Sequence, residues 1–208
     1  KASAVGGFLG VKVGPHLPIT RRALTNLRMA FPDWSDVEIL ATVRGMWDHL
    51  GRVVAEYPHL GEFDVSGRDG RVEIVGTEHL DLLRDDQIAG ILIAGHIGNW
   101  ELGPLVARHR GISLVPIYRA ANNPYVERLI QRARGSGGGG SYYPKSRTGA
   151  RALLEAIKHG GHLGILVDQK YNEGIPVPFF GHDAMTTTAP ASFAIRYRIP
   201  LVPARVER

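Results

Sequence analysis

A histidine and a glutamate five positions apart are the side chains of this chain best suited to acid–base chemistry. His96 and Glu101 lie in the stretch GHIGNWEL, at the end of the apolar run IAGILIAG of residues 88–95. A neutral imidazole can take a proton from a hydroxyl group, and a carboxylate on its other ring nitrogen stabilises the imidazolium that forms. The pair therefore predicts a general base with an orienting acidic partner. The alternative is a solvated histidine after a strand and a glutamate that complements a helix dipole.

A strand, a tight turn and a helix must position this pair. Residues 88–95 are too few to span a bilayer and predict a buried strand. Residues 99–109, NWELGPLVARH, predict a helix with Asn99 as its N-cap. Side chains five residues apart diverge within one continuous helix, but a turn at Gly98 allows the two to face each other. They would then lie in a crevice at the sheet edge, where open α/β folds bind ligands.

Two later strands predict further polar side chains at the same edge. Arg119 follows the strand predicted at residues 112–118 and is suited to bidentate contact with phosphate. The alternative is a surface arginine paired with a helix carboxylate. Asp168 and Gln169 follow the strand candidate LGILV. Asp168 can support His96 as a second carboxylate, or it can cap the following turn.

An aromatic pair lies in PVPFFGHDAMTTTAP, residues 176–190. Phe179 and Phe180 can form the walls of an apolar channel. The alternative is a loop that plugs the core, with a threonine as the next N-cap. The sequence leaves both interpretations open.

From residue 71 onward, short apolar runs alternate with segments of helical periodicity. The predicted strands are RVEIV, AGILIAG, ISLVPIY, LGILV and PLVPARV, and the predicted helices are EHLDLLR, NWELGPLVARH, PYVERLIQRAR, TGARALLEAIKH and TAPASFAIRYR. Strands separated by helices predict crossover connections and an α/β fold, with a mostly parallel central sheet and helices on both faces. We assign this core to residues 67–208.

Residues 1–66 predict a helical segment packed on that core. Thr20 can cap the short helix RRALTNLRMAF, and Ser35 with Glu38 has capping-box spacing at the start of a longer helix. The apolar stripe of the longer helix predicts packing surface, with a membrane or partner face as the alternative. The chain starts at Lys1 rather than at Met, and it ends in RIPLVPARVER, a segment that predicts a strand. We therefore expect truncation at both ends.

Composition excludes several classes of site. The chain has 208 residues, a net charge of +5 and no cysteine, which excludes disulfides, thiolate metal sites and a cysteine nucleophile. The basic balance favours anionic partners. No G-x-S-x-G, H-E-x-x-H or strand-linked G-x-G-x-x-G is present, and the cations are not interleaved with aromatics. We therefore predict no metal, no bound cofactor and no nucleic-acid partner.

The stretch GSGGGGS, residues 135–141, has the composition of a flexible linker. A natural phosphate-binding loop would end in Lys followed by Ser or Thr, which this stretch lacks. We interpret it as an engineered replacement of a longer mobile loop.

Together these motifs resemble a known family. H-x-x-x-x-E after an apolar strand, then YR…NP, DQ and PFFG before a Thr-rich helix entry, resemble the bacterial lipid A biosynthesis (lauroyl/myristoyl) acyltransferases. These belong to the wider glycerolipid acyltransferase superfamily. The segments ALTNLRMAFP and GMWDHLGRVVAEYPHL are similar to the family's helical lead-in, so the resemblance runs from about residue 14 to the end.

The resemblance implies roles for individual residues. His96 would be the general base and Glu101 its acidic partner, while Asp168 matches a position that in some relatives carries a second carboxylate near the histidine. Arg119 would bind the anionic acceptor, and Lys145 belongs to a matching PK motif.

Other residues are substrate-binding candidates for the same reaction. Backbone N–H groups near Gly98 and Asn99 are candidate donors to the developing oxyanion. Gln169 lies beside the second carboxylate, and Phe179 and Phe180 are candidate walls of an acyl groove.

The implied reaction moves a fatty acyl group from an acyl-carrier-protein or acyl-CoA thioester to a hydroxyl of a lipid A precursor. Its partners would be an anionic glycolipid, the carrier protein or acyl-CoA, and the cytoplasmic face of the cell inner membrane. One alternative acceptor is a phosphatidylinositol mannoside or another glycolipid. An alternative of a different class is a lipid- or carrier-binding module without catalysis.

Overall fold

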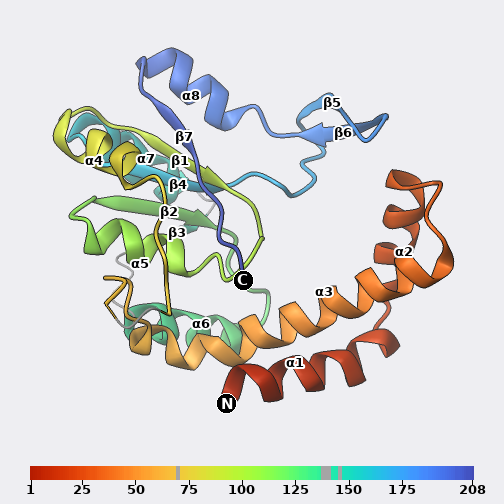
Figure 1. Ribbon diagram of the computed structural model, residues 1–208. Coiled ribbons are helices and arrows are strands. Elements are labelled where there is room, and N and C mark those ends of the chain that lie inside the picture. The colour runs from red at the N-terminus through yellow and green to blue at the C-terminus, as the bar shows by residue number, and fades with distance from the viewer. Residues whose placement is uncertain (69–70, 137–141, 145–146) are drawn as a thin grey trace. The chain divides into compact units, whose positions relative to one another are not determined.

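The computed structural model describes residues 1–68, 71–136, 142–144 and 147–208 (Figure 1). The chain divides into two compact units. The helical unit comprises Lys1–Pro58 and Pro176–Met185, and the sheet unit comprises His59–Ile175 and Thr186–Arg208. The assignment of residues 1–66 to a helical lead-in packed on a core of residues 67–208 stays a prediction.

A parallel sheet forms the centre of the sheet unit, with five strands among the described residues. In spatial order these are β3 (Tyr143–Pro144), β2 (Leu114–Tyr118), β4 (His162–Leu166), β1 (Ile91–Ala94) and β7 (Leu201–Pro203). Each neighbouring pair is parallel. The predicted α/β fold with a mostly parallel sheet is therefore confirmed.

Helices cover both faces of this sheet, because the chain crosses it in one direction from β1 to β3 and in the other from β3 to β7, and crossovers of one hand then fall on opposite faces. Along the chain they are α4 (Thr77–Asp85), α5 (Leu102–His109), α6 (Pro124–Ser136), α7 (Arg147–Lys158) and α8 (Ala189–Tyr197). The crossovers place α5 and α6 on one face and α7 and α8 on the other (Figure 1). Burial on both faces explains why the central strands are continuous apolar runs in the sequence.

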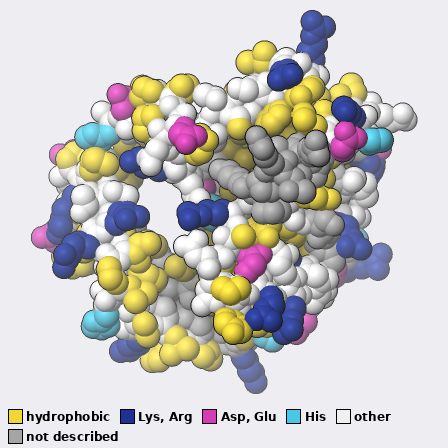
Figure 2. All heavy atoms as spheres, turned by 180° about the vertical axis from the view of Figure 1, so that it is seen from behind, with side chains coloured by type: hydrophobic (Ala, Val, Ile, Leu, Met, Phe, Trp, Pro, Cys, Tyr) yellow, Lys and Arg dark blue, Asp and Glu magenta, His cyan; other side chains and the backbone are white. Residues whose placement is uncertain are grey.

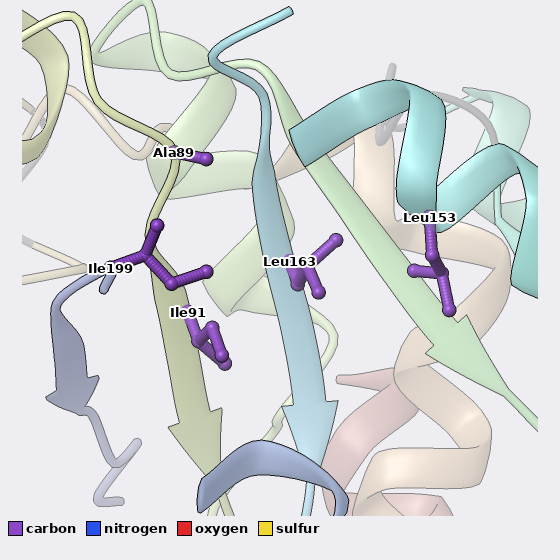
Figure 3. Close-up of a cluster of buried hydrophobic side chains, with 5 residues drawn as sticks. All are labelled: Ala89, Ile91, Leu153, Leu163 and Ile199. Carbon is purple, nitrogen blue, oxygen red and sulfur yellow. The ribbon is translucent and has the colours of Figure 1, made fainter. Parts of the chain in front are cut away.

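The main hydrophobic core lies on the α7 and α8 face (Figure 3). Ile91 of β1 and Leu163 of β4 face each other in register and have no exposed surface. Leu153 of α7 and Ile199, just after α8, pack on the same cluster. This packing holds the two strands that carry the candidate site in fixed register.

One predicted strand is wrong. Residues 71–75, RVEIV, form no strand, and Val75 is 86% exposed. The run alternates apolar and charged residues as a half-buried strand does, and Val72 and Ile74 are partly buried, but no strand of the described part of the chain pairs with it. Local alternation favours a strand only where tertiary neighbours exist.

The helical unit contains α1 (Ala2–Val13), η1 (Gly14–His16), α2 (Ile19–Ala30) and α3 (Asp36–Glu56), with the short helix η2 (Tyr57–Glu62) after it and most of the hairpin formed by β5 (Ile175–Phe179) and β6 (His182–Thr186). The predicted capping box is present: Ser35 Oγ accepts from Glu38 N–H, and Glu38 Oε2 accepts from Ser35 N–H at 2.7 Å. It satisfies two free N–H groups at the start of α3.

Helix α1 packs on α3 through glycines rather than through its bulky residues. A Cβ on Gly10 would lie 2.1 Å from the Trp47 carbonyl oxygen, and one on Gly6 would lie 2.3 Å from that of Gly51. The bulky residues point away instead, with Phe8 60% exposed and its apolar neighbours similarly so. No helix among the described residues combines the length and apolar character needed to cross a bilayer.

Candidate active site

The register of two neighbouring strands brings His96 and Asp168 together. Ala94 at the end of β1 lies opposite Leu166 at the end of β4, so the residues two positions further on meet at the same sheet edge. His96 Nδ1 lies 2.7 Å from Asp168 Oδ1, and His96 N–H donates to Oδ2 at 2.7 Å. One carboxylate therefore holds both the ring and the backbone of the histidine.

These contacts set the state of the pair. Burial raises the pKa of Asp168, but hydrogen bonds from the ring and backbone of His96 and the charge of that ring outweigh it. The pKa of Asp168 therefore lies below its usual range, and the carboxylate is ionised at neutral pH. An ionised Asp168 accepts from Nδ1–H, which leaves Nε2 of the neutral ring with its lone pair available.

The His96 ring is accessible to a substrate. Its side chain is 32% exposed. The ring lies edge-on to Trp100, with centroids 4.9 Å apart. Within the described part of the chain, the other ring nitrogen, Nε2, has no hydrogen-bond partner. A neutral histidine in this state can accept a proton from a hydroxyl group.

Glu101 is not the partner of the histidine, and this part of the prediction needs correction. Its carboxylate accepts two hydrogen bonds from Arg134, from Nε at 3.0 Å and from Nη2 at 2.7 Å. Tyr142 Oη donates to the same group at 3.3 Å. The Glu101 side chain is 2% exposed. The turn after β1 points it into the interior, so Asp168 rather than Glu101 contacts the imidazole.

The turn that separates the two side chains contains Gly98, as predicted, with a φ of +58°. A Cβ at this position would lie 2.1 Å from the Val206 carbonyl oxygen. Helix α5 starts at Leu102, three residues after the predicted N-cap, because Asn99 turns the chain first: its Oδ1 accepts from Glu101 N–H at 3.3 Å. The role of Gly98 and Asn99 as oxyanion donors stays a prediction.

Of the other predicted substrate-binding residues, Arg119 and Gln169 lie at the same sheet edge as His96. Arg119 directly follows β2, beside β4, and is exposed, with its Nη2 3.5 Å from Asn122 Oδ1. Gln169 is exposed next to Asp168. Lys145 and residues 137–141 of the Gly-rich stretch lie outside the described residues. Arg119 is thus at the predicted edge with its guanidinium open to an anion.

The aromatic pair belongs to the helical unit. Phe180 and Gly181 both have positive φ (49° and 73°) and form the two-residue turn between β5 and β6. The Phe180 ring packs edge-on against Phe31 at 5.0 Å and against Phe179 at 4.7 Å. Both phenylalanines are more than half exposed. Their role as walls of an acyl groove stays a prediction.

Sequence reasoning missed a group of polar residues on α6. Glu127, Gln131 and Arg134 are spaced i, i+4 and i+7 and therefore share one helix face. Arg134 is buried against Glu101, and Glu127 and Gln131 bond to Tyr118 at the end of β2. This spacing is a signal that the three polar side chains lie together. On a helix rich in arginine, however, the same spacing is also typical of a solvent-exposed face.

Comparison with known proteins agrees with the motif analysis. The family model described as "Bacterial lipid A biosynthesis acyltransferase" matches residues 1–208. A curated protein of Haemophilus influenzae, "Lipid A biosynthesis acyltransferase", is 24% identical over 181 residues, which cover 84% of this chain. The matched region spans 55% of the length of that relative.

Proposed function

Since the chain belongs to the bacterial lipid A biosynthesis acyltransferase family, we propose that it transfers a fatty acyl group from a thioester of acyl carrier protein or coenzyme A to a hydroxyl of a lipid A precursor. The observation that carries this proposal is the His96–Asp168 pair at the carboxyl edge of a parallel sheet. The pair has one ring nitrogen held by a carboxylate and the other open for a hydroxyl group.

In the proposed reaction His96 Nε2 takes the proton of the acceptor hydroxyl as its oxygen attacks the thioester carbonyl. A C–O bond forms, and the C–S bond breaks when the tetrahedral intermediate collapses. The proton on Nε2 then passes to the departing thiolate. Asp168 stays ionised and stabilises the imidazolium in between. A thioester is already activated, so this route needs no enzyme nucleophile.

A phosphorylated acceptor fits the charge of the site. Arg119 is exposed beside the catalytic edge and presents a planar guanidinium suited to phosphate. Phosphatidylinositol mannosides and other anionic glycolipids share this chemistry. They are alternative acceptors for the same site, and the assay below distinguishes them.

The helical unit supports contact with an anionic lipid surface at the cytoplasmic face of the inner membrane. Residues 1–32 contain five Lys and Arg and no Asp or Glu. They also expose apolar side chains, namely Val5, Phe8, Leu9, Val13, Leu17, Ile19 and Met29. A groove of about 520 Å³ beside α1 is lined by Phe8 and Val11 together with Arg44 and the Arg52–Asp48 ion pair, so that Arg44 is the cation there without a carboxylate among the ion pairs described. Apolar and cationic side chains both reach the surface in Figure 2, as interfacial lipid binding requires.

The test is thiol release from acyl-CoA and acyl-carrier-protein thioesters, with and without a lipid A precursor. The parent protein should release thiol only with the acceptor, and His96→Ala should lose that release. His109→Ala, an exposed histidine at the end of α5, is the matched control and should keep the parent rate.

Three results would contradict parts of the proposal. Equal release by the parent and His96→Ala would remove the histidine from the mechanism. Release with a phosphatidylinositol mannoside alone would change the acceptor. Binding of the lipid or the thioester without any turnover would support a binding module instead of an enzyme.

A further inference from the structure

Helix α6 carries a polar stripe that contacts two different loops of the candidate site. The stripe consists of Glu127, Gln131 and Arg134, which share one face of the helix. One of these loops follows β1 and carries His96, and the other follows β2 and carries Arg119. Each end of the stripe bonds to one of the loops.

The Arg134 end holds the loop after β1. Its guanidinium makes the two hydrogen bonds to Glu101 described above, and both side chains are buried, with 10% and 2% exposure. The guanidinium lies over the ring of Tyr142 at 4.1 Å and over that of Tyr118 at 4.9 Å. A planar cation bound in this way fixes the orientation as well as the position of its carboxylate.

The Glu127 end holds the loop after β2. Glu127 Oε2 accepts from the backbone N–H of Ala121 at 2.7 Å, two residues after Arg119. Glu127 Oε1 accepts from Tyr118 Oη and from Gln131 Nε2, both at 2.7 Å. Burial raises the pKa of Glu127, but these hydrogen bonds and the charge of Arg134 outweigh it, so the carboxylate is ionised.

From this geometry we infer that the α6 stripe is a positioning device whose two ends act mainly on different loops of the site. Arg134, through Glu101, sets the loop that aims the general base, and Glu127, through Ala121, sets the loop that presents Arg119 to the anionic acceptor. The inference rests on the proposed function of that site. Neither residue touches reacting atoms, so both are positioning residues.

The two ends should therefore affect different kinetic constants. Arg134→Lys keeps the charge but loses the two-point contact and the aromatic stacking. It should lower kcat about tenfold or more and change the KM for the acceptor by less than about twofold. Glu127→Gln keeps the shape but loses the charge. It should raise the KM for the acceptor about fivefold or more and leave kcat within about twofold.

The controls are Arg132→Lys, an exposed arginine on another face of α6, and Glu155→Gln, an exposed carboxylate of α7 paired with Lys158. Both should keep the parent constants. Circular dichroism and thermal unfolding of each variant establish that the fold is retained. The inference would be overturned if Arg134→Lys and Glu127→Gln changed kcat and KM in the same way, or if neither variant changed either constant.

A second readout does not depend on turnover. In NMR spectra, Arg134→Lys should shift the ring nitrogen signals of His96, assigned by their loss in His96→Gln, and should leave the amide of Ala121 in place. Glu127→Gln should do the reverse. If the parent protein is inactive but the variants show this pattern of shifts, the proposed function is rejected and the positioning device is retained. Shifts at both loops in both variants would reject the device.

Discussion

Replacement of Asp168 by Asn is the sharpest test of the proposed catalytic role of the His96–Asp168 pair. The carboxylate accepts from two donors on the same residue, the ring Nδ1 and the backbone N–H of His96. A carboxamide has one acceptor oxygen, so one of the two contacts must be lost. If its NH₂ group faces the ring, Nδ1 becomes the acceptor and the proton moves to Nε2, where the substrate proton has to go.

The expected loss follows from the strength of that contact. A hydrogen bond to a charged group contributes about 1.5–3 kcal/mol, and about 1.36 kcal/mol corresponds to a tenfold change in rate. A complete loss would lower kcat about 10- to 150-fold. Because the side chains of His96 and Asp168 are 32% and 41% exposed, solvent screening favours the lower part of this range, about 10- to 30-fold.

The assay is acceptor-dependent thiol release at saturating thioester, measured from about pH 5 to 9, the range in which histidines titrate. Asp85→Asn is the control, because this exposed aspartate pairs with Arg84 elsewhere on the sheet unit. The control should keep the parent kcat throughout. A kcat of Asp168→Asn within twofold of the parent over the whole range would refute the assignment of Asp168 as the orienting carboxylate.

Three further predictions concern stability. Gly98→Ala should lower the unfolding midpoint, since the added Cβ would meet the Val206 carbonyl oxygen at 2.1 Å and the φ of +58° disfavours it; an unchanged thermal midpoint would contradict this. Leu163→Ala should cost about 2–5 kcal/mol of unfolding free energy in urea titrations, because the side chain is fully buried. The folded-state pKa of Asp168 is depressed, so its stabilising contribution should be present above the ordinary value of about 3.9 and be lost as pH falls below it. The difference in unfolding midpoint between parent and Asp168→Asn should therefore shrink between neutral pH and about pH 3; a constant difference would contradict the ionised pair.

The sequence predicted that His96, Arg119 and Asp168 would lie at one edge of the sheet, but it did not predict which carboxylate contacts His96. His96, Arg119 and Asp168 each follow an apolar run, and the ends of parallel strands meet at one edge. Which carboxylate meets the imidazole depends on β4 lying next to β1, a pairing between distant parts of the chain. Glu101 is closer in sequence, but the turn after β1 directs it to Arg134 instead.

The packing of the α1 glycines and the burial of Arg134 could not be predicted either, because both depend on contacts with other elements. The glycines of α1 indicate poor helix propensity, yet close packing on α3 makes them necessary there. Arg134 has the sequence environment of a solvated helix face, and only the positions of Glu101, Tyr118 and Tyr142 make its burial favourable. In both cases the deciding contact comes from another element. Local patterns identified the capping box of α3 because all of its groups lie within four residues.

The strand order has a consequence for the time course of folding. Strand β1 lies between β4 and β7, which both follow it by a long stretch of chain, whereas α1, α2 and α3 are neighbours in sequence. Contacts between distant segments close large loops and form slowly, and local helical contacts form fast. The His96–Asp168 hydrogen bonds need the β1–β4 pairing, so we expect them to form late in folding. In refolding experiments, recovery of helical signal should precede recovery of the histidine–carboxylate pair, and the pair then reports on completion of the central sheet.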